Sequence, residues 1–286
     1  MPEAAIIIPH YNDVPRLLRC LEALAPQVGP DVELVVVDNS STDDLGPVRT
    51  AFPGVRLVIE ARKGAAAARN RGVAETTAPR LFFTDADCVP ASDWVATALA
   101  VSDSADLVGG AVGVFDETPP PRSGAEAFEA VFAFDNRRYV EEENFSVTAN
   151  LLTTRGVFEA TGPFVVGLSE DLEWCQRATS RGFSIRYEDR LRVTHPSRSD
   201  WPALAKKWKR MTLESFGVNG TDPVSRLRWV GRAGLMPVSI LVHVPRVLRH
   251  PGLRDGGEKR AALGTLVRQR LSRMGWMLRQ ALTGRP

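Results

Sequence analysis

Short apolar runs that alternate with helical patterns constrain the fold of this chain most strongly. The runs are rich in Val and Ile and cover residues 4–8, 32–37, 55–59 and 81–84. The segments between them, residues 14–24, 45–51 and 65–75, have helical spacing. Continuous apolar runs of this length are typical of buried parallel strands. The alternation therefore predicts a doubly wound α/β sheet with a Rossmann-like first half.

The pattern continues less regularly after residue 105. A strand is expected at residues 106–114, and the Pro-rich segment 118–124 predicts a break that serves as a lid or a linker. Helical spacing follows at residues 125–142 and 170–181, with strands expected at 145–152, 184–187 and 192–195. Strands of both orientations fit such an order, so the sequence predicts a mixed sheet.

Two carboxylates follow the fourth apolar run. The strand at residues 81–84 leads directly to Asp85 and Asp87. In open α/β sheets, ligands bind beyond the carboxyl ends of the strands, where such a pair can hold a divalent cation against a diphosphate. Because Asp is also a common turn residue, the pair needs support from other motifs.

The charge is divided unevenly along the chain. Residues 201–286 carry 17 Lys and Arg against 4 Asp and Glu, while residues 1–200 have a net charge of −11. Such a basic tail can meet anionic lipid, nucleic acid or its own acidic domain. Residues 258–282 place their leucines on one helical face and arginines on the others, which predicts either an interfacial membrane helix or a helix packed on the catalytic domain. The nearly uncharged run 233–245 is too short to span a bilayer.

Cysteine usage and the N-terminus favour a cytoplasmic protein. The three cysteines are widely spaced and show no pattern of metal ligands, so we expect reduced thiols. No basic segment followed by an apolar segment precedes the first strand, and export is not expected. The basic tail adds the expectation of peripheral attachment at the inner face of the membrane.

Five motifs occur in a characteristic order. They are IIIPHYN from residue 6, VVVDNSSTD from residue 35, ARNRG from residue 68, DAD from residue 85 and SEDLE from residue 169. Over residues 4–200 this series resembles the family 2 glycosyltransferases. The resemblance implies a GT-A fold and an inverting transfer of a hexose from a nucleotide-activated sugar. It also implies nucleotide-sugar binding by residues 1–115, an acceptor side at residues 116–200, and a basic helical extension at 201–286.

The resemblance assigns a nucleotide site. Pro9 and Tyr11 would lie beside the base, and Asp38 would accept a hydrogen bond from it. A carboxylate accepts from a ring N–H, so a UDP, GDP or TDP donor is expected and cytosine is disfavoured. Asp38 could instead cap the following helix. Arg69 either contacts the nucleotide region or pairs with an acidic strand end, and Asp85 contributes to the same region.

The resemblance also assigns the ligands of a metal ion and a general base for the transfer. Asp87 would be the direct ligand of Mg²⁺ or Mn²⁺, with Asp85 near it and His195 as a third ligand or an ordinary polar residue. Asp171 would be the general base, although acidic residues also favour the first turn of a helix. The motif departs from the family pattern at Glu173 and Trp174.

Three further residues are assigned to the acceptor or donor-sugar side: Asn150, Phe164 and Glu170. For Asn150, a simple role at a strand end remains open. The expected acceptor is a glycan or a lipid-linked sugar, and nucleic acid is not the expected partner.

Two other functions fit parts of the sequence. A dinucleotide-binding oxidoreductase would use Asp38 at the ribose, but no Gly-x-Gly-x-x-Gly follows the first strand. A non-catalytic module whose tail binds nucleic acid or membrane would show salt-sensitive affinity for DNA or RNA. Asp85, Asp87 and Asp171 favour catalysis over this non-catalytic module.

Overall fold

The computed structural model describes residues 2–167 and 169–285, and it confirms the α/β prediction. In the described residues the strands form one eight-stranded sheet in the order β3-β2-β1-β4-β7-β6-β8-β5. The strands are β1 Ala4–His10, β2 Val32–Asp38, β3 Arg56–Ile59, β4 Arg80–Thr84, β5 Val89–Pro90, β6 Leu107–Phe115, β7 Asn150–Thr154 and β8 Ile185–Pro196.

The first four major strands run parallel, which brings their carboxyl ends to one edge. β1 pairs with both β2 and β4, with His10 opposite Asp38 in the register of β1 and β2. β7 pairs antiparallel with both β4 and β6, so the sheet is mixed as expected. The loops after β1, β2 and β4 therefore lie beside one another.

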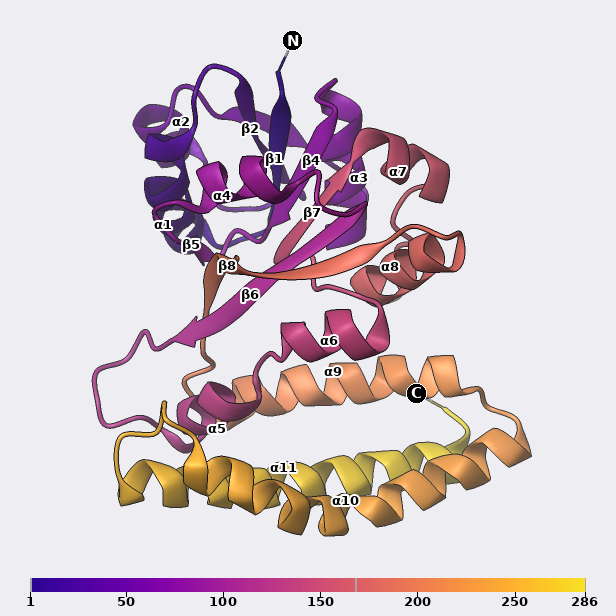
Figure 1. Cartoon of the computed structure of the whole chain (residues 1–286). Helices are drawn as coiled ribbons and strands as arrows, with labels where there is room; N and C mark the ends of the chain where they lie inside the picture. The colour runs from indigo at the N-terminus through magenta and orange to yellow at the C-terminus, as the bar shows by residue number, and fades with distance from the viewer. Residues whose placement is uncertain (1, 168, 286) are drawn as a thin grey trace. The chain divides into compact units, whose positions relative to one another are not determined.

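Helices cover both faces of the sheet (Figure 1). They are α1 Val14–Leu24, α2 Gly46–Ala51, α3 Ala65–Glu75, α4 Trp94–Val101, α6 Asn136–Glu143, α7 Arg155–Thr161 and α8 Glu170–Ser180, with a short 3₁₀ helix at Ala25–Gln27. Ile6 and Ile8 of β1 pack in one core with α1, α2 and α4, while Ile7 packs in another with α3, α7 and α8. This alternation is the two-residue period of a strand that is buried on both faces.

The chain divides into two compact units. The N-terminal unit comprises residues up to Gly113 together with Asp135–His195, and the C-terminal unit comprises Val114–Phe134 and the residues from Pro196 onward. The C-terminal unit contains α5 Gly124–Phe132, α9 Trp201–Asn219, α10 Pro223–Arg249 and α11 Gly256–Thr283. In it, α11 packs against α5, α9 and α10. Residues 114–134, which the sequence placed before the basic extension, thus cluster with its helices.

Several expected elements differ from the structure. The helical pattern at 125–142 forms two helices, α5 and α6, and the two strands expected between 184 and 195 form the single strand β8. The strand expected at 145–152 begins only at Asn150. Before it, the buried ring of Phe145 stacks on Tyr139 at 4.9 Å between ring centroids. The Pro-rich segment is tied down by an ion pair of 2.6 Å between Arg122 and Asp116. No helix within the described ranges is both long enough and apolar enough to cross a membrane.

Gly72 sets how closely α3 approaches the sheet. A Cβ atom at this position would lie 2.5 Å from Cγ2 of Ile7 and 3.2 Å from Cγ2 of Val37. Both neighbours belong to central parallel strands, so neither can move without disturbing the sheet. The close packing of α3 on the sheet therefore explains the glycine of the ARNRG motif.

Replacing Gly72 with Ala should lower the free energy of unfolding by about 1–3 kcal/mol, because the added methyl group overpacks the core. Urea denaturation with the same m-value would measure the shift in midpoint. Gly156→Ala is the matched control, since Gly156 lies in α7 and a Cβ there meets nothing within 4 Å. Equal midpoints for Gly72→Ala and the wild type would contradict this account of the contact.

Candidate active site

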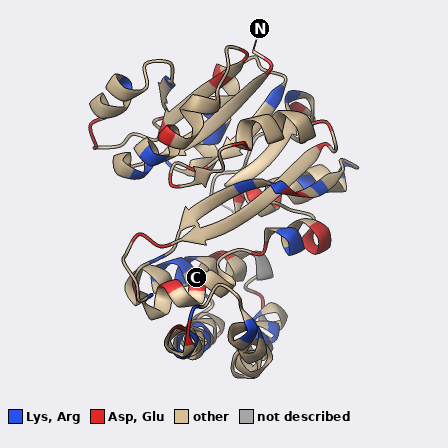
Figure 2. Cartoon of the chain, turned by 60° about the vertical axis from the view of Figure 1, so that its left-hand side comes forward, with Lys and Arg blue, Asp and Glu red and all other residues tan. Residues whose placement is uncertain are grey.

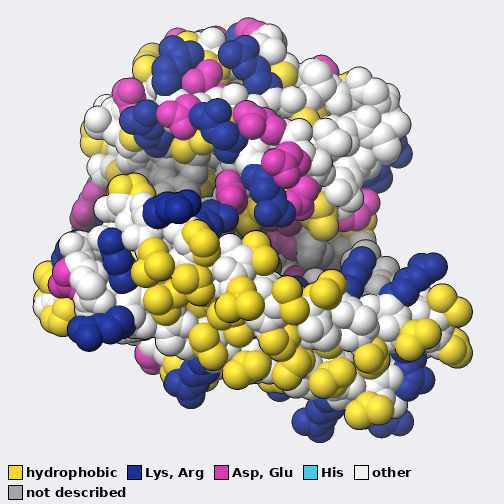
Figure 3. Space-filling view, turned by 60° about the horizontal axis from the view of Figure 1, so that its bottom comes forward, with side chains coloured by type: hydrophobic (Ala, Val, Ile, Leu, Met, Phe, Trp, Pro, Cys, Tyr) yellow, Lys and Arg dark blue, Asp and Glu magenta, His cyan; other side chains and the backbone are white. Residues whose placement is uncertain are grey.

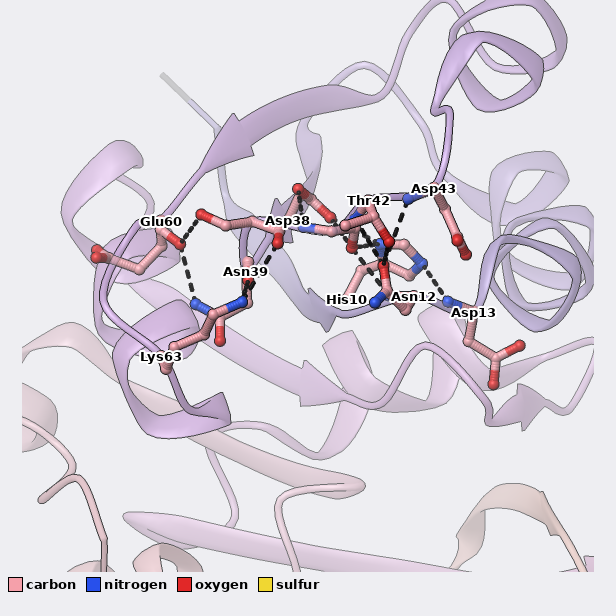
Figure 4. A network of polar contacts seen from close by, with 11 residues as sticks. His10, Asn12, Asp13, Asp38, Asn39, Thr42, Asp43, Glu60 and Lys63 are labelled. Atoms are coloured by element: carbon pink, nitrogen blue, oxygen red, sulfur yellow. Dashed lines mark hydrogen bonds and ion pairs between the residues drawn. The ribbon is translucent and has the colours of Figure 1, made fainter.

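Asp38 ends β2 inside a network of hydrogen bonds (Figure 4). Its Oδ1 accepts from His10 Nδ1 at 3.0 Å and from the Ser41 hydroxyl, and its Oδ2 accepts from the Ser41 backbone N–H at 3.0 Å. Burial alone would raise the pKa of Asp38, but the bonds from Ser41 and His10 outweigh it and lower the pKa. The carboxylate is thus held ionised and in a fixed orientation at the strand end.

His10 is a residue of this network that sequence reasoning did not assign. The backbone N–H of Asp13 donates to its Nε2 at 3.1 Å, so Nδ1 must carry the proton that His10 donates to Asp38. The side chain is fully buried. A polar residue at the end of an otherwise apolar strand was the signal that could have indicated it.

The loops after β1 and β2 are joined by side chains at their tips. Asn12 Oδ1 accepts from the backbone N–H of Thr42 at 2.7 Å, and Asn39 Oδ1 accepts from the backbone N–H of Gly64 at 2.7 Å (Figure 4). Asp38 therefore closes a local turn and does not cap α2, which begins at Gly46.

Tyr11 is exposed at this edge. Its side chain is 55% exposed, and Lys63 Nζ lies 4.4 Å from the centre of its ring. Lys63 also donates to the backbone oxygen of Ser40 at 3.3 Å. Pro9, also expected beside the base, is half-buried within β1. An aromatic face, a cation and the Asp38 carboxylate are thus carried by neighbouring strand ends.

Arg69 of α3 joins two acidic motifs. It is only 3% exposed, and its Nη2 donates to Asp85 Oδ1 at 2.6 Å while its Nη1 donates to Glu170 Oε1 at 2.9 Å. Burial by itself lowers the pKa of Arg69, but Asp85, Glu170 and Asp171 together raise it. Its Nε is buried without a hydrogen-bond partner in the described part of the chain.

Asp87 contacts His195. Asp87 Oδ2 lies 3.0 Å from His195 Nε2, and the carboxylate is 29% exposed. Burial raises the pKa of Asp87, but the bond from His195 and the charge of Arg16 lower it overall. The expected set of Asp85, Asp87 and His195 does not form a ready three-ligand metal site. No group of three His, Cys, Asp or Glu side chains among the described residues could hold a metal ion. At this strand end Arg69 binds Asp85 and His195 binds Asp87.

Asp171 lies in the first turn of α8, and its pKa is raised above the ordinary value for an aspartate. Its Oδ1 accepts from the backbone N–H of Leu172 at 2.8 Å. Burial raises its pKa to about 6; Glu170 and Asp85 also raise it, against the opposing effects of the Leu172 N–H and Arg69. A carboxyl group with this pKa can both take up and release a proton near neutral pH.

Hydrogen bonds from three side chains hold the loop before α8. Asn70 pairs with the backbone of Phe164 through two bonds of 2.9 Å. From α8, Trp174 Nε1 donates to Gly162 O at 2.8 Å, and Arg177 donates to Pro163 O at 2.8 Å. These bonds fix the chain up to Phe164, while the following Val165 and Val166 are exposed. Leu168, which follows in this loop, lies outside the described residues.

The side chains of Phe164 and Asn150 are buried inside the protein. The Phe164 ring is 2% exposed and packs 5.4 Å from Phe83 and 5.1 Å from Trp174, measured between ring centres. Asn150 is fully buried; its Nδ2 donates to the backbone oxygens of Ala111 and Leu191, and its Oδ1 accepts from Trp94. Both side chains are thus engaged by packing and hydrogen bonds within the protein.

Comparison with known proteins identifies the family. The family model described as Glycosyl transferase family 2 matches residues 5–160. Glycosyltransferase AglE of Haloferax volcanii is 31% identical over 269 residues, which cover 90% of this chain and 87% of that protein. The chain belongs to glycosyl transferase family 2. It is an inverting glycosyltransferase.

Further relatives agree with this assignment. The PGL/p-HBAD biosynthesis glycosyltransferase Rv2957 of Mycobacterium tuberculosis is 33% identical over 258 residues, covering 84% of this chain and 90% of that protein. Among solved structures, the mannosyltransferase PcManGT from Pyrobaculum calidifontis, in complex with GDP-Man and Mn²⁺, matches with a TM-score of 0.57. The match covers 99% of this glycosyltransferase and 74% of that chain at 18% identity, so it establishes the GT-A fold.

The raised pKa of Asp171 predicts a pH-dependent cost to stability. Because the pKa rises from 3.8 to about 6 on folding, the folded state holds this proton more tightly, and the carboxyl group destabilises the fold increasingly as pH rises from about 4 to 6. At pH 8, Asp171→Asn of this glycosyltransferase should therefore be more stable than the wild type by about 1–3 kcal/mol. Urea denaturation at pH 8 and at pH 4 would test this, with the gain absent at pH 4.

Glu170→Gln is the matched control for this experiment. It removes one of the two carboxylates that pair with the buried Arg69, so it should lower stability at pH 8. An Asp171→Asn protein that is no more stable than the wild type at pH 8 would contradict the raised pKa.

Proposed function

We propose that this enzyme transfers a sugar from a nucleoside diphosphate to an acceptor hydroxyl, with Asp171 as the general base. The observation that carries the proposal is the link that Arg69 makes between Asp85 and Glu170, the neighbour of Asp171 in α8. This link joins the helix that carries a carboxyl group with a pKa of about 6 to the strand end where a diphosphate would lie. Arg69 is a positioning residue in this proposal, because it is buried and acts through the two carboxylates.

The transfer is a single displacement. Asp171 takes the proton of the acceptor hydroxyl while that oxygen forms a bond to the anomeric carbon. The bond between the anomeric carbon and the diphosphate oxygen breaks, and the nucleoside diphosphate leaves with the bonding electrons. Attack from the side opposite the leaving group inverts the configuration at the anomeric carbon, as the family requires.

The acidic strand end fits a divalent cation. With Asp85, Asp87, Glu170 and Asp171 ionised and Arg69 as their cation, the group carries a net charge of −3, which would repel a diphosphate. Mg²⁺ is typically held by one or two carboxylates together with substrate phosphates and water. Asp87 and Asp85 would therefore be enough protein ligands for the cation. When bound, Mg²⁺ or Mn²⁺ would neutralise the charge that develops on the departing diphosphate. His195 would orient Asp87, and ligation by His195 itself would require it to give up that contact.

The base site favours a nucleobase with a ring N–H. Asp38 accepts three bonds from protein groups, which leaves lone-pair capacity on Oδ2 for one more donor. Uracil, thymine and guanine supply such a donor, and Tyr11 offers an exposed face for stacking. The proposed donor is therefore of the UDP, GDP or TDP type, and the GDP-Man complex of the structural neighbour is compatible with it.

Calorimetric titration with UDP, GDP and TDP, each with and without Mn²⁺, tests the donor site. One nucleotide should bind with Mn²⁺ and bind about tenfold or more weakly without it, because a metal–diphosphate contact is lost. Asp87→Ala should reduce the binding to the metal-free level. Asp103→Ala is the matched control, since Asp103 pairs with Arg80 at the opposite end of β4. Unchanged binding by Asp87→Ala would refute the metal assignment, and no binding by the folded wild type would refute the donor site.

We further propose that the C-terminal unit attaches the enzyme to an anionic membrane at the cytoplasmic face, where it would meet a lipid-linked or glycan acceptor. One face of α10 carries a stripe of exposed apolar side chains. Leu227, Leu241 and Val242 are 72%, 74% and 69% exposed. The remaining exposed apolar residues of α10 are Val224, Val230, Leu235, Val238 and Leu248. Figure 3 shows hydrophobic side chains gathered on this face of the unit.

The charges around this stripe suit an anionic surface. No acidic residue occurs between Asp222 and Asp255, whereas six arginines flank the uncharged run 233–245. Figure 2 marks the Lys and Arg positions of these helices in blue. Apolar side chains that enter the headgroup region, with cations beside them, are the features of an interfacial helix.

The membrane face lies on a different helix from the one the sequence indicated. Leu266 and Met277 of α11 are buried, because α11 packs against α5, α9 and α10. Val267, Leu271 and Leu282 of α11 stay exposed, but the exposed apolar stripe of α10 has more members. Both α10 and α11 are amphipathic, and only their packing decides which apolar face stays exposed. The proposal therefore assigns the membrane contact to α10.

Vesicle sedimentation tests this attachment. The wild type should bind vesicles that contain phosphatidylglycerol more strongly than pure phosphatidylcholine, and added salt should weaken the binding. Leu235→Glu with Leu241→Glu should reduce the partition coefficient about tenfold or more, since burial of each leucine is favourable. Ile59→Glu changes an exposed apolar residue of the N-terminal unit and should have no effect. Unchanged binding by the double variant, or a stripe covered by a second copy in a stable dimer, would contradict the proposal.

A further inference from the structure

The buried face of α11 contains a polar layer in its middle. Apolar side chains are buried toward both ends of the helix, at Ala262, Leu266, Met277 and Ala281. Between them lie Gln269, which is fully buried, and Arg270, which is 9% exposed. Arg273 follows one turn after these two, on the same side of the helix. A helix face that packs against neighbours normally stays apolar throughout, so this interruption calls for a physical reason.

Helix α9 supplies the other side of this layer. Trp208 of α9 packs with its ring centre 5.3 Å from the guanidinium carbon of Arg273. Separate apolar clusters lie beyond each end, one containing Leu204 with Leu266 and the other containing Phe216 with Met277. The polar layer thus separates two apolar cores of the C-terminal unit.

The layer presents N–H groups that have nothing to bind. Four of its nitrogens are buried without a hydrogen-bond partner in the described ranges: Trp208 Nε1, Gln269 Nε2, Arg270 Nε and Arg273 Nε. The Gln269 Oε1 atom already accepts from Arg270 Nη1 at 3.0 Å. All four unpartnered atoms are donors, and a buried donor without an acceptor is costly.

The two arginines also lack a counter-charge. No ion pair within the described residues involves Arg270 or Arg273. Burial lowers the pKa of Arg270 to about 10, with a further contribution from Arg273, and burial lowers the pKa of Arg273 as well.

Another buried charge in the same unit behaves differently. Glu129 is 2% exposed and pairs with both Arg198 and Lys207 at 2.9 Å. The unit therefore compensates a buried charge elsewhere but not in this layer. A buried cation without an anion is among the most unfavourable arrangements in a protein.

We propose that the layer between α9 and α11 is a binding site for a phosphate group. Four buried donors with no acceptor favour an anion, and a phosphate dianion would balance the charge of two guanidinium groups. The phosphate could be free in solution or could be the head of a lipid. This site goes beyond the proposed transfer reaction and does not depend on the donor site, since all of its residues belong to the C-terminal unit.

Titration calorimetry on the full-length protein, in chloride buffer with EDTA, tests the site with inorganic phosphate as the probe. Phosphate should bind saturably, beyond the effect of sodium chloride at matched ionic strength. Arg270→Met and Arg273→Met should each weaken the binding about tenfold or more, because each removes charge-assisted hydrogen bonds. Arg279→Met changes an exposed arginine of the same helix and should bind as the wild type does.

Thermal unfolding without phosphate gives a second, independent readout. Arg270→Met should unfold at the same temperature as the wild type or higher, because it removes an uncompensated buried charge. A structural arginine would behave in the opposite way, so a clear loss of stability would overturn the proposal. If Arg273→Met does not fold, Trp208→Phe keeps both charges, removes one donor, and should still weaken phosphate binding about threefold.

Hexyl phosphate and hexanol distinguish the two sources of phosphate. Tighter binding of hexyl phosphate than of inorganic phosphate, with hexanol inert, would support a lipid phosphate. Equal affinities would support free phosphate. Binding that persists in the Arg270→Met, Arg273→Met double variant, or heats no larger than those of chloride, would overturn the site.

Discussion

The edge of the sheet depends on one buried cation, Arg69. Its guanidinium joins Asp85, which follows β4, to Glu170, which begins α8, although these residues are far apart in the chain. Removing the arginine would leave two carboxylates without a partner close to a third, Asp171. Loss of one member from such a buried group typically costs several kcal/mol. The end of β4 and the start of α8 therefore both depend on Arg69 for their stability. The small residues before Arg69 and the close contact of Gly72 with β1 set the depth at which this cation lies.

The same arrangement explains why Asp171 differs from its neighbours. Arg69 directly bonds only Asp85 and Glu170, so Asp171 receives the field of the cation but no hydrogen bond from it. Its main compensation is one backbone N–H, which burial and the other carboxylates outweigh. A carboxyl group with a pKa of about 6 is thus obtained at a cost to stability.

Sequence reasoning succeeded where a residue's position followed from the end of a regular strand. Asp38, Asp85 and Asp87 follow apolar runs, and parallel pairing alone brings such residues to one edge. It did not show that the side chains of Asn150 and Phe164 are buried, because the direction of a side chain depends on register and on neighbours that only the folded chain supplies. His10 was hidden for a different reason. Its role depends on a partner in the adjacent strand, and one chain read alone does not show which residues face each other across a ladder.

The helices of the C-terminal unit combine two features that soluble proteins avoid. The stripe on α10 exposes large apolar side chains to water, and the layer between α9 and α11 buries cations that lack anions. Each feature raises the free energy of the unit in isolation, and each would be relieved by a partner of definite chemistry. The stripe requires an apolar phase, whereas the layer requires an anion. Inorganic phosphate would satisfy only the second requirement. An anionic lipid carries an apolar chain and a phosphate in one molecule, so the coexistence of both features in one small unit favours a lipid over a free ion.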